Sequence, residues 1–454
     1  MTNIDIKSLK NKKLLVLCES PNKVKHISEF LKDAGYTNTK VMASVGHISV
    51  LKDNKASYKN TGIFPDKGFK MNLAIAEDKK DVVDKLKAAA TVSDYIFLMT
   101  DGDREGEAIA WSLIHFLKLD KTKCFRAITH EITKNAVVAA IENPVKLDEN
   151  LIDAAHARQI LDKLVGYSLS PIAKAYIGAK SVGRCQSAGL KLVVDREKEI
   201  QNFVPETYYD LYVNFIKNGE TFKAKYVGTD KEEISHLSSM SEINVIKFKC
   251  SDKYIVKNIS KKEKQEAPKP PFCTATFQQE AASKLGLKVK DAMAIAQKLF
   301  ENSYITYMRT DDTEFSPEFI NILKPYVLKE YKEYVEPRKG KKTGGEQCGH
   351  ECLRVTDPAM TPEMYSKIDS NIFNNKVYTL IWQRTIAAVL PNARYSETIY
   401  SIYNNDQKFI LTSKELIDPG FKKVYNYSDS AETSAVVKET FKENEVLTII
   451  EGDK

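Results

Sequence analysis

The sequence predicts a multi-domain α/β protein, and three observations support this fold class. Its 454 residues suffice for about three domains of ordinary size. Near the N-terminus, apolar strand-like segments alternate with helical segments, which is typical of a parallel sheet covered by helices. Residues 207–260 and 397–450 instead alternate polar with apolar side chains, as half-exposed strands do. Because a helical stretch separates these two segments, we expect one β-rich domain interrupted by an inserted domain.

The composition is that of an ordinary globular protein. Hydrophobic residues make up 43% and charged residues 28% of the chain, which excludes a mainly disordered or collagen-like protein. The apolar runs are too short to cross a bilayer, and residues 1–13 lack the apolar stretch of a signal peptide. Seven dispersed cysteines without a CxxC pair indicate free thiols in a reducing compartment. We therefore expect a protein that is neither secreted nor membrane-bound, and its net charge of +7 is compatible with a polyanionic partner.

The first strand and helix are predicted at residues 14–18 and 22–34. Residues 14–18 (LLVLC) are continuously apolar, which indicates a buried strand. Ser20 suits the N-cap of the helix, and Pro21 suits its first position because no N–H donor is needed there. This strand and helix form the first repeat of the α/β pattern.

The second strand and helix, over residues 95–100 and 106–117, enclose an acidic sequence, TDGDREGE. Four carboxylates follow the ends of the two predicted strands: Glu19, Asp101, Asp103 and Glu105. Since the carboxyl ends of parallel strands meet at one edge of a sheet, we expect these side chains to converge. Converging carboxylates repel one another unless a cation lies among them, and their hard oxygens favour Mg²⁺. The alternative is an acidic helix N-terminus, where Asp and Glu suit the helix dipole.

Further along, the spacing of apolar residues predicts the remaining elements. They are helices over 153–165, 188–203 and 275–301, a short strand over 304–308, a charged, proline-rich joint over 263–271 and a mobile Gly/Lys loop over 338–349. The joint combines prolines with charged residues, which ends regular structure and marks a domain boundary.

Several motifs resemble known families. The motifs ESPNK (residues 19–23), SVGH (44–47) and TDGDREGEA (100–108) resemble the Toprim domain of type IA DNA topoisomerases, which has a Rossmann-like parallel sheet. Primases and some nucleases also contain a Toprim domain, so the rest of the chain decides between these families. The motif ITYMRTD (305–311) resembles the active-site motif of type IA topoisomerases, and Met308 favours their bacterial-type topoisomerase I branch.

In the ITYMRTD motif, Tyr307 matches the nucleophile. A phenol can attack phosphorus and store the bond energy as a phosphotyrosine ester. An unperturbed tyrosine has a pKa near ~10, so it needs help at neutral pH. Arg309 would supply one cation from the same strand and Lys23 a second, and both would stabilise charge on the phosphoryl oxygens.

The resemblance extends from about Lys13 to the end of the chain. The other matching segments are residues 125–134, 157–167, 181–187, 271–281 and 350–357. By resemblance, His350 contacts the region of the scissile phosphate, and a further set of residues binds DNA. The expected DNA-binding residues are His47, Arg104, Arg126, Arg158, Arg184, Gln186, Thr306, Asp311 and Arg354.

The resemblance also implies a toroid-type architecture of four domains. These are a Toprim domain (11–145), a helical DNA-binding domain (146–206), a β-rich arch domain (207–267 and 376–454) and an inserted mixed domain carrying the active-site tyrosine (268–375). The family continues into a helical segment with a GIGRPSTYA-like motif, and many members end in zinc ribbons. This sequence has neither, so we expect a C-terminally truncated core with an incomplete toroid.

The implied activity is transient cleavage of one DNA strand. Tyr307 attacks a phosphate and keeps the 5′-phosphate, Glu19 protonates the leaving 3′-hydroxyl, and a second strand passes before the break is resealed. Mg²⁺ held by the four carboxylates aligns the resealing step. No ATP is expected, because the glycines of residues 178–183 are not followed by the Lys and Ser/Thr of a phosphate-binding loop. We expect a monomer in the cytoplasm, at the nucleoid, that relaxes negatively supercoiled DNA through its single-stranded, underwound segments.

Two other functions stay open at this point. A Toprim nuclease or primase would work at the acidic cluster, but it would leave the Tyr307 motif unexplained. A non-catalytic single-strand-binding remnant would bind DNA in a salt-sensitive way and form no covalent product. A zinc site at Cys348 and Cys352 would need a second pair of ligands nearby, which the sequence lacks.

Overall fold

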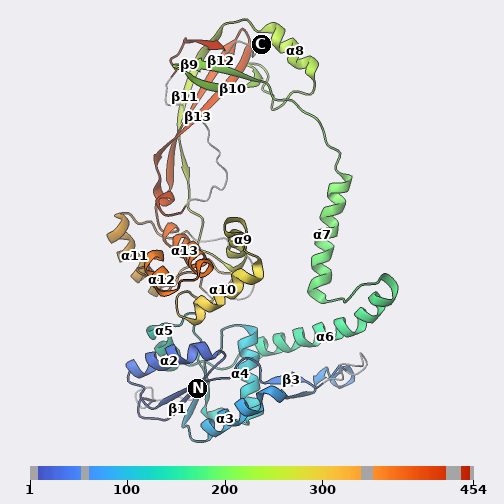
Figure 1. Ribbon diagram of the computed structural model, residues 1–454, viewed down its shortest axis with the longest axis vertical. Helices are drawn as coiled ribbons and strands as arrows, with labels where there is room; N and C mark the ends of the chain where they lie inside the picture. Colours follow the sequence, from blue (N-terminus) through green and yellow to red (C-terminus); the bar gives the residue numbers. More distant parts are fainter. Residues whose placement is uncertain (1–8, 53–60, 339–350, 426–440, 450–454) are drawn as a thin grey trace. The chain divides into compact units, whose positions relative to one another are not determined.

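A computed structural model of the protein describes residues 9–52, 61–338, 351–425 and 441–449. The predicted Gly/Lys loop from residue 339 onward, Cys348 and His350 therefore lie outside the described residues. The chain divides into two compact units, whose elements are labelled in Figure 1. The first unit comprises Met1–Gln201, Pro271–Ile322 and Lys339–Trp382, and the second comprises Asn202–Pro270, Leu323–Arg338 and Gln383–Lys454. Within the described ranges, no helix combines the length and the apolar character that crossing a membrane requires.

The first unit begins with a four-stranded parallel sheet. Its strands in spatial order are β2 (Thr39–Ala43), β1 (Leu14–Cys18), β7 (Tyr95–Leu98) and β8 (Cys124–Arg126). The register places Val16 beside Val41 on one side and Phe97 on the other. Every residue of β1 is buried, as its continuous apolar sequence predicts. The predicted parallel sheet is thus confirmed, and its two predicted strands are neighbours at its centre.

Helices cover both faces of this sheet. They are α2 (Pro21–Asp33), α3 (Lys80–Thr91), α4 (Arg104–Leu117) and α5 (Lys134–Glu142). Helices α3 and α4 pack on one face, where Leu86 and Leu113 share a core with Leu15 and Leu98 of the strands. Helix α2 contacts both β2 and α5. Its N-cap is Ser20, whose Oγ accepts a hydrogen bond from the Asn22 N–H, as predicted.

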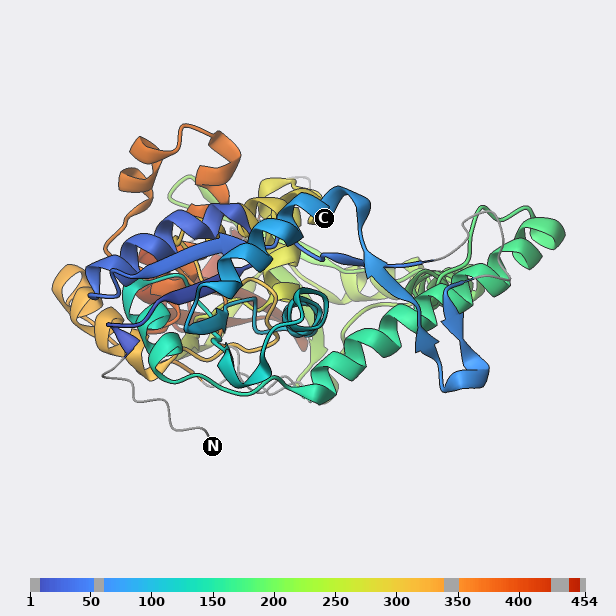
Figure 2. The same ribbon diagram turned by 90° about the horizontal axis from the view of Figure 1, so that it is seen from below.

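Two short hairpins lie between β2 and α3 in the sequence. One pairs β3 (Ser49–Leu51) with β6 (Leu73–Ile75), and the other pairs β4 (Ile63–Phe64) with β5 (Lys70–Met71). We call residues 49–52 and 61–75 the arm. Figure 2 shows the arm in blue, projecting from the sheet beside the long helix α6 (Glu149–Ile177).

The remaining elements are mainly helical. They are α7 (Arg184–Asn202), α9 (Thr274–Leu285), α10 (Val289–Glu301), α11 (Pro317–Tyr331), α12 (Pro362–Ile368) and α13 (Ile372–Ala387). The helix predicted over 275–301 is two helices, because Gly286 adopts a left-handed conformation (φ +63°) that ends α9. Helix α6 is longer than predicted and continues through Pro171.

The strand predicted over 304–308 is wrong. Only an isolated bridge between Ile305 and Val355 is present. The neighbouring Thr306 N–H donates to the Arg354 carbonyl, while the Thr306 hydroxyl accepts from the Arg354 N–H at 2.9 Å. The Arg354 N–H thus bonds the Thr306 side chain instead of a backbone carbonyl. The ladder of backbone hydrogen bonds therefore does not extend, and the segment stays irregular.

The second unit contains a closed six-stranded barrel. Its strands are β9 (Tyr212–Lys217), β10 (Glu220–Thr229), β11 (Tyr254–Glu266), β12 (Ala393–Asn404), β13 (Gln407–Asp418) and β14 (Val446–Ile449), joined in the order β10-β13-β12-β11-β14-β9. Strands from before and after the helical stretch thus share one barrel. Phe215, Tyr254 and Phe409 fill its core together with helix α8 (Met240–Lys249). Residues 263–266, predicted as part of the proline-rich joint, belong to β11, where they pair with β12.

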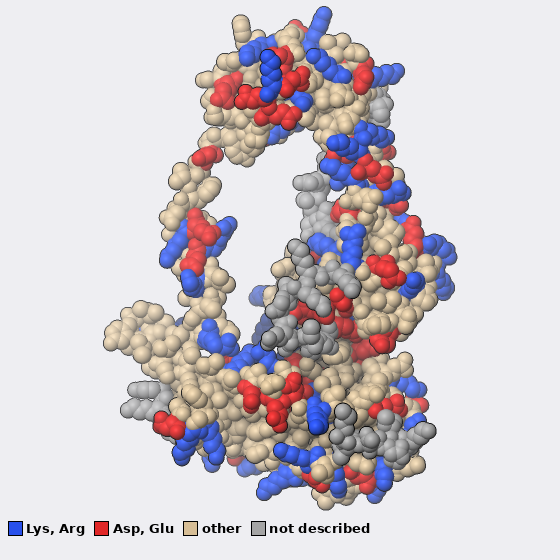
Figure 3. All heavy atoms as spheres, turned by 180° about the vertical axis from the view of Figure 1, so that it is seen from behind, with Lys and Arg blue, Asp and Glu red and all other residues tan. Residues whose placement is uncertain are grey.

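Charged side chains of both signs are mixed on the surface. On the face drawn in Figure 3, the coloured Lys and Arg side chains lie among Asp and Glu side chains on both units. On this face the positive side chains are not gathered into one continuous patch. Local geometry consequently says more about function than the overall charge does.

Candidate active site

The loop between β7 and α4 is folded around one buried arginine. Arg126 is fully buried, and its Nε donates to Glu107 Oε1 at 2.7 Å. Its Nη1 donates to the carbonyls of Leu98 and Thr100 at 2.8 Å, and its Nη2 donates to the carbonyl of Asp101 at 2.6 Å. The prediction that Arg126 binds DNA is therefore corrected, because its donors are used inside the domain.

Gly106 allows this loop to close tightly. A Cβ atom at residue 106 would lie 2.0 Å from the Asp101 carbonyl oxygen, so only glycine fits. The Gly106 N–H donates to Asp103 Oδ1 at 2.8 Å, and the Gly106 carbonyl accepts from the Thr100 hydroxyl at 2.7 Å. Asp103 is thereby the N-cap of α4, and the cap uses only one of its two carboxylate oxygens.

Glu19, at the end of β1, lies beside Asp101. The Asp101 N–H donates to Glu19 Oε1 at 2.9 Å, and the buried Lys23 ammonium forms an ion pair with the Asp101 carboxylate. Burial and the negative charge of Asp101 raise the pKa of Glu19 to about 7, although Lys23 opposes this. Burial alone would lower the pKa of Lys23, but Asp101 and Glu19 outweigh it and raise that pKa above its usual value. The site therefore holds a crowded set of carboxylates with one ammonium among them.

Tyr307 reaches this group of carboxylates from a distant segment. Its hydroxyl donates to Asp103 Oδ2 at 2.6 Å, across 204 positions of sequence, and only 4% of the residue is exposed. Its backbone N–H donates to the His130 carbonyl at 2.9 Å. The ring packs edge-on against Phe300, with centroids 5.3 Å apart. The tyrosine and the acidic loop of the sheet thus form one site.

The charges around Tyr307 differ from the prediction. Burial, followed by Asp101 and Asp103, raises the pKa of Tyr307 well above its usual value, and Arg309 lowers it by less. Arg309 Nη1 lies 3.8 Å from Asp103 Oδ2, so its positive charge is partly offset by that carboxylate. The expectation that cations activate the phenol is therefore not met in this state, where the phenol keeps its proton.

Thr306 and Arg354 hold the tyrosine segment and are buried themselves. The Arg354 guanidinium bonds Glu351 Oε1 at 2.6 Å and Glu131 Oε2 at 2.8 Å, and it stacks on the Phe319 ring at 3.7 Å. The prediction that Thr306 and Arg354 contact DNA is corrected, because neither side chain reaches solvent and both have partners within the protein.

Besides the Tyr307 hydroxyl and the Arg309–Asp103 ion pair, three hydrogen bonds between described residues join the sheet domain to the tyrosine segment. They are Tyr307 N–H to the His130 carbonyl (2.9 Å), Arg354 Nη2 to Glu131 Oε2 (2.8 Å) and Asn22 Nδ2 to Glu301 Oε2 (2.7 Å). All six residues belong to the first unit. These contacts fix Tyr307 against the acidic loop.

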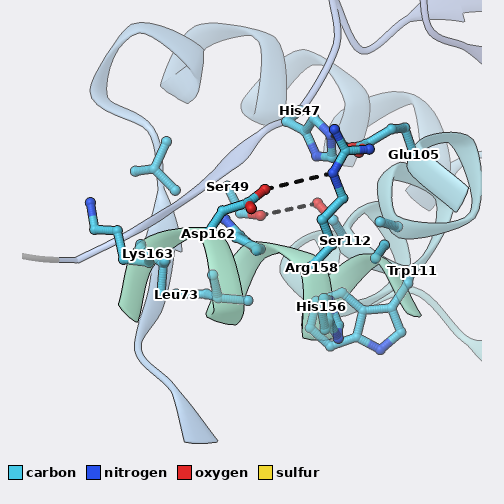
Figure 4. A pocket seen from close by; sticks show the side chains of 15 residues that line it. His47, Ser49, Leu73, Glu105, Trp111, Ser112, His156, Arg158, Asp162 and Lys163 are labelled. Atoms are coloured by element: carbon cyan, nitrogen blue, oxygen red, sulfur yellow. Dashed lines mark hydrogen bonds and ion pairs between the residues drawn. The ribbon is translucent and has the colours of Figure 1, made fainter. Parts of the chain in front are cut away.

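A cavity of about 760 Å³ lies beside this site, between the arm, α4 and α6 (Figure 4). Glu105 faces it and pairs with His47 (Nε2 to Oε2, 3.1 Å) and Arg158 (Nη1 to Oε1, 3.8 Å). Glu105 thus has its described partners in this cavity, and its predicted place among the metal-holding carboxylates stays a prediction. Within the described ranges, no three Asp, Glu, His or Cys side chains are arranged to hold a metal ion.

A second cavity, of about 830 Å³, shares Arg158 and Asp162 with the first. Arg184 and Gln186 line it, and Arg184 Nε lies 2.9 Å from Asp162 Oδ1. Four predicted DNA-binding residues, His47, Arg158, Arg184 and Gln186, thus lie along two adjoining cavities. Arg104 and Asp311 are exposed outside them, and His350 lies outside the described residues.

The predictions missed three residues of the site, and the sequence contained signals for two of them. Asp162 lies four positions after Arg158, the spacing of an ion pair on one helix face, and the pair is present. Glu107 follows Asp103 by four positions on α4 and faces the interior. Glu131 gave no signal beyond its place in a resembling segment, because its partner Arg354 is remote in the sequence.

Comparison with known proteins gave matches over nearly the whole chain. A family model described as DNA topoisomerase matches residues 146–453, and a Toprim domain model matches residues 14–132. The chain is 36% identical to DNA topoisomerase 1 of Rickettsia felis, over 95% of this chain and 58% of that protein. It is 37% identical to DNA topoisomerase 1 of Rickettsia typhi, over 91% and 55% respectively. The chain therefore spans less than two thirds of the length of these curated relatives.

A solved structure is also similar. Full-length topoisomerase I from Thermotoga maritima is 32% identical and superposes with a TM-score of 0.79, over 96% of this chain and 70% of that chain. This similarity and the parallel sheet confirm the predicted multi-domain α/β class.

We predict that Arg126→Ala destabilises the first unit strongly. The substitution leaves Glu107 buried without its cation, which costs about 3–5 kcal/mol in comparable cases. Urea unfolding followed by tryptophan fluorescence measures the change, because Trp111 and Trp382 both belong to the first unit. Arg104→Ala is the matched control, since this exposed arginine should alter stability by less than about 0.5 kcal/mol. Equal effects of the two substitutions would contradict the role assigned to Arg126.

The raised pKa of Glu19 predicts a pH dependence of stability. The pKa of Glu19 is about 7 in the folded protein and 4.5 in a free side chain. The contribution of protonated Glu19 to the free energy of unfolding is therefore fully present below pH 4.5 and is lost as the pH rises through about 7. In a chelating buffer, the free energy of unfolding of the wild type should therefore fall relative to Glu19→Gln across this pH interval. Urea unfolding at several pH values measures it, with Glu77→Gln as an exposed control. Parallel pH profiles for wild type and Glu19→Gln would rule the prediction out.

Proposed function

The chain belongs to the type IA DNA topoisomerases, and from this membership we propose that it cleaves and reseals one strand of DNA through Tyr307. The observation that carries the proposal is the hydrogen bond between the Tyr307 hydroxyl and Asp103. It brings the motif of residues 305–311 and the acidic loop together in one site. A nuclease or primase acting at the acidic loop alone would have no use for this tyrosine.

In the proposed reaction, the Tyr307 hydroxyl gives its proton to Asp103, its hydrogen-bond acceptor, while its oxygen attacks a DNA phosphorus and the 3′-oxygen leaves. A 5′-phosphotyrosine ester forms, and its bond energy drives resealing without ATP. Lys23 and Arg309 offset the charge that develops on the phosphoryl oxygens. Glu19 protonates the leaving 3′-oxygen, and its pKa of about 7 suits a general acid near neutral pH.

The carboxylates suit a divalent cation, although no preformed cluster of three is found among the described residues. Glu19, Asp101 and Asp103 supply hard oxygen donors, and burial together with repulsion from the other two carboxylates raises the pKa of Glu19. Added positive charge would relieve that repulsion. We propose that these three residues hold Mg²⁺, which would supply positive charge to the phosphate during resealing.

We propose that single-stranded DNA follows the two adjoining cavities. His47, Arg158, Arg184 and Gln186 line them and offer donors to phosphates and base edges. Arg104, Asp311 and His350 stay predicted contacts. The DNA would be the underwound, negatively supercoiled form, and the protein a monomer located with the nucleoid in the cytoplasm.

Strand passage requires the tyrosine segment to separate from the Toprim domain. Separation must break the bonds of Tyr307 to Asp103 and His130, the ion pair of Arg354 with Glu131, and the Asn22–Glu301 hydrogen bond. These bonds favour the closed state, so we propose that their combined strength limits how often the gate opens.

Covalent trapping tests the proposed chemistry. The full chain is mixed with a single-stranded oligonucleotide, denatured and examined for a protein–DNA adduct. A label at the 3′ end should stay with the protein and a label at the 5′ end should not, because the enzyme keeps the 5′-phosphate. We expect Tyr307→Phe to bind the oligonucleotide and form no adduct, since it lacks the attacking oxygen.

Tyr304→Phe is the matched control, because Tyr304 is a neighbouring tyrosine outside the site and should leave the adduct intact. An adduct in Tyr307→Phe would exclude Tyr307 as nucleophile. Binding by the wild type without any adduct would favour the single-strand-binding alternative. Hydrolysed DNA in both variants would favour the nuclease alternative.

The closed-state contacts give a second prediction. Glu131→Gln removes a charge-assisted hydrogen bond to Arg354, which is typically worth about 1.5–3 kcal/mol. The Tyr307 amide, bonded to the His130 carbonyl, should then exchange its hydrogen roughly tenfold to one-hundredfold faster. Hydrogen exchange measured by mass spectrometry tests this, with Glu318→Gln as an exposed control on α11. Unchanged exchange at Tyr307 would show that the ion pair does not hold the gate.

A further inference from the structure

The arm forms part of the wall of the proposed DNA cavity. Ser49 and Leu73, from β3 and β6, face the same cavity as Arg158 of α6, as Figure 4 shows. The outer hairpin, β4 with β5, continues the arm beyond these strands. A strand of DNA leaving the cavity along the arm would therefore meet this outer hairpin.

Two exposed phenylalanines lie on the outer hairpin. Phe64 is 43% exposed and Phe69 is 52% exposed, whereas Ile63, next to Phe64, is buried. Alternation along β4 thus turns Ile63 inward and Phe64 outward. Exposing an aromatic side chain to water costs more free energy than exposing the polar residues usual at a hairpin tip. The position of the two phenylalanines therefore needs an explanation.

The backbone at the tip is strained at Phe69. Its φ is +60°, directly after Gly68 at +65°. Glycine adopts such angles freely, but a bulky aromatic residue does so rarely and at a cost of about 1–3 kcal/mol. The chain therefore holds an exposed aromatic ring in a costly conformation, which is typical of a residue selected for contact with a ligand.

Lysines accompany the two rings. Lys67 Nζ lies 5.6 Å from the centre of the Phe64 ring, and Lys70 is paired directly across the hairpin from Phe64. The described arm residues include three lysines (Lys52, Lys67 and Lys70) and one acid, Asp66. Within the described part of the chain, Lys67 and Lys70 form no salt bridge. Rings interleaved with unpaired cations match a single nucleic-acid strand, whose bases stack and whose phosphates are anionic.

We propose that the outer hairpin of the arm is a second binding surface for single-stranded DNA, where bases stack on Phe64 and Phe69 and phosphates contact Lys67 and Lys70. The inference rests on the proposed function for the identity of the ligand. It adds a contact outside the active site and its two cavities. Since every base has a stacking face, the contact is independent of DNA sequence.

The test compares the full chain with the variant Phe64→Ala/Phe69→Ala. Fluorescence anisotropy measures affinity for labelled oligothymidylates of about 6 and about 24 nucleotides, because only the longer one can fill a cavity and extend onto the arm. The variant should bind the longer oligonucleotide roughly fivefold to one-hundredfold more weakly, as alanine substitution of stacking residues does elsewhere. Its affinity for the shorter one should stay within about twofold.

Matched variants separate stacking from folding. Phe64→Tyr/Phe69→Tyr keeps both rings and should restore affinity for the longer oligonucleotide, and Val92→Ala, at an exposed apolar residue outside the arm, should have no effect. Equal affinity of the alanine variant and the wild type for the longer oligonucleotide would overturn the proposal and favour a protein partner for this hairpin. An equal loss for both lengths, or no recovery in the tyrosine variant, would also overturn it.

Failure of the proposed binding by the arm can be told apart from failure of the proposed cleavage by Tyr307. The same mixtures are denatured and examined for the Tyr307 adduct. Wild-type protein that binds both oligonucleotides without an adduct contradicts the cleavage chemistry, while the length-dependent loss still decides the role of the arm.

Discussion

Arg126 holds the acidic loop in the shape on which the site depends. Its guanidinium donates to the carbonyls of Leu98, Thr100 and Asp101, at the end of β7 and just after it. It also pairs with Glu107, and the whole side chain is away from water. A buried ion pair is costly unless its donors are satisfied, and here the loop itself supplies the acceptors. The Asp101 amide consequently points at Glu19, and Asp103 caps α4 with one oxygen while the other meets Tyr307. The geometry of the candidate site therefore rests on a buried residue that takes no part in the proposed chemistry.

The same arrangement describes a resting state. Tyr307 is buried and keeps its proton, because burial and two carboxylates outweigh Arg309. A bound phosphate would bring its own charge between these groups, and a divalent cation on the carboxylates would weaken their hold on the phenol. The proposed nucleophile is thus buried and protonated, and the polar contacts that bury it are those that opening of the proposed gate would have to break.

Much of the fold could be predicted because the signals are local. The buried strand β1, the cap at Ser20 and the helix α4 follow from short stretches of sequence, and they are present. The environment of individual site residues could not be predicted in this way. Thr306 and Arg354 stand in motifs that suggest DNA contact, yet partners remote in the sequence bury them. Glu105 follows the spacing of Asp101 and Asp103, but its place on the first turn of α4 directs it to His47 and Arg158. Motifs identify which residues matter, whereas burial depends on tertiary contacts.

The barrel has a consequence for how the protein is made. Strands β9, β10 and β11 leave the ribosome before the whole tyrosine-bearing stretch, and their partners β12, β13 and β14 follow only after it. During that interval β11 presents an unpaired edge on the nascent chain, which is a site for wrong pairing and aggregation. Its exposed end, residues 261–264, reads Lys-Lys-Glu-Lys. Charges of this kind on an edge strand discourage association with other chains, and β11 carries them from the moment it is made, before β12 can pair with it.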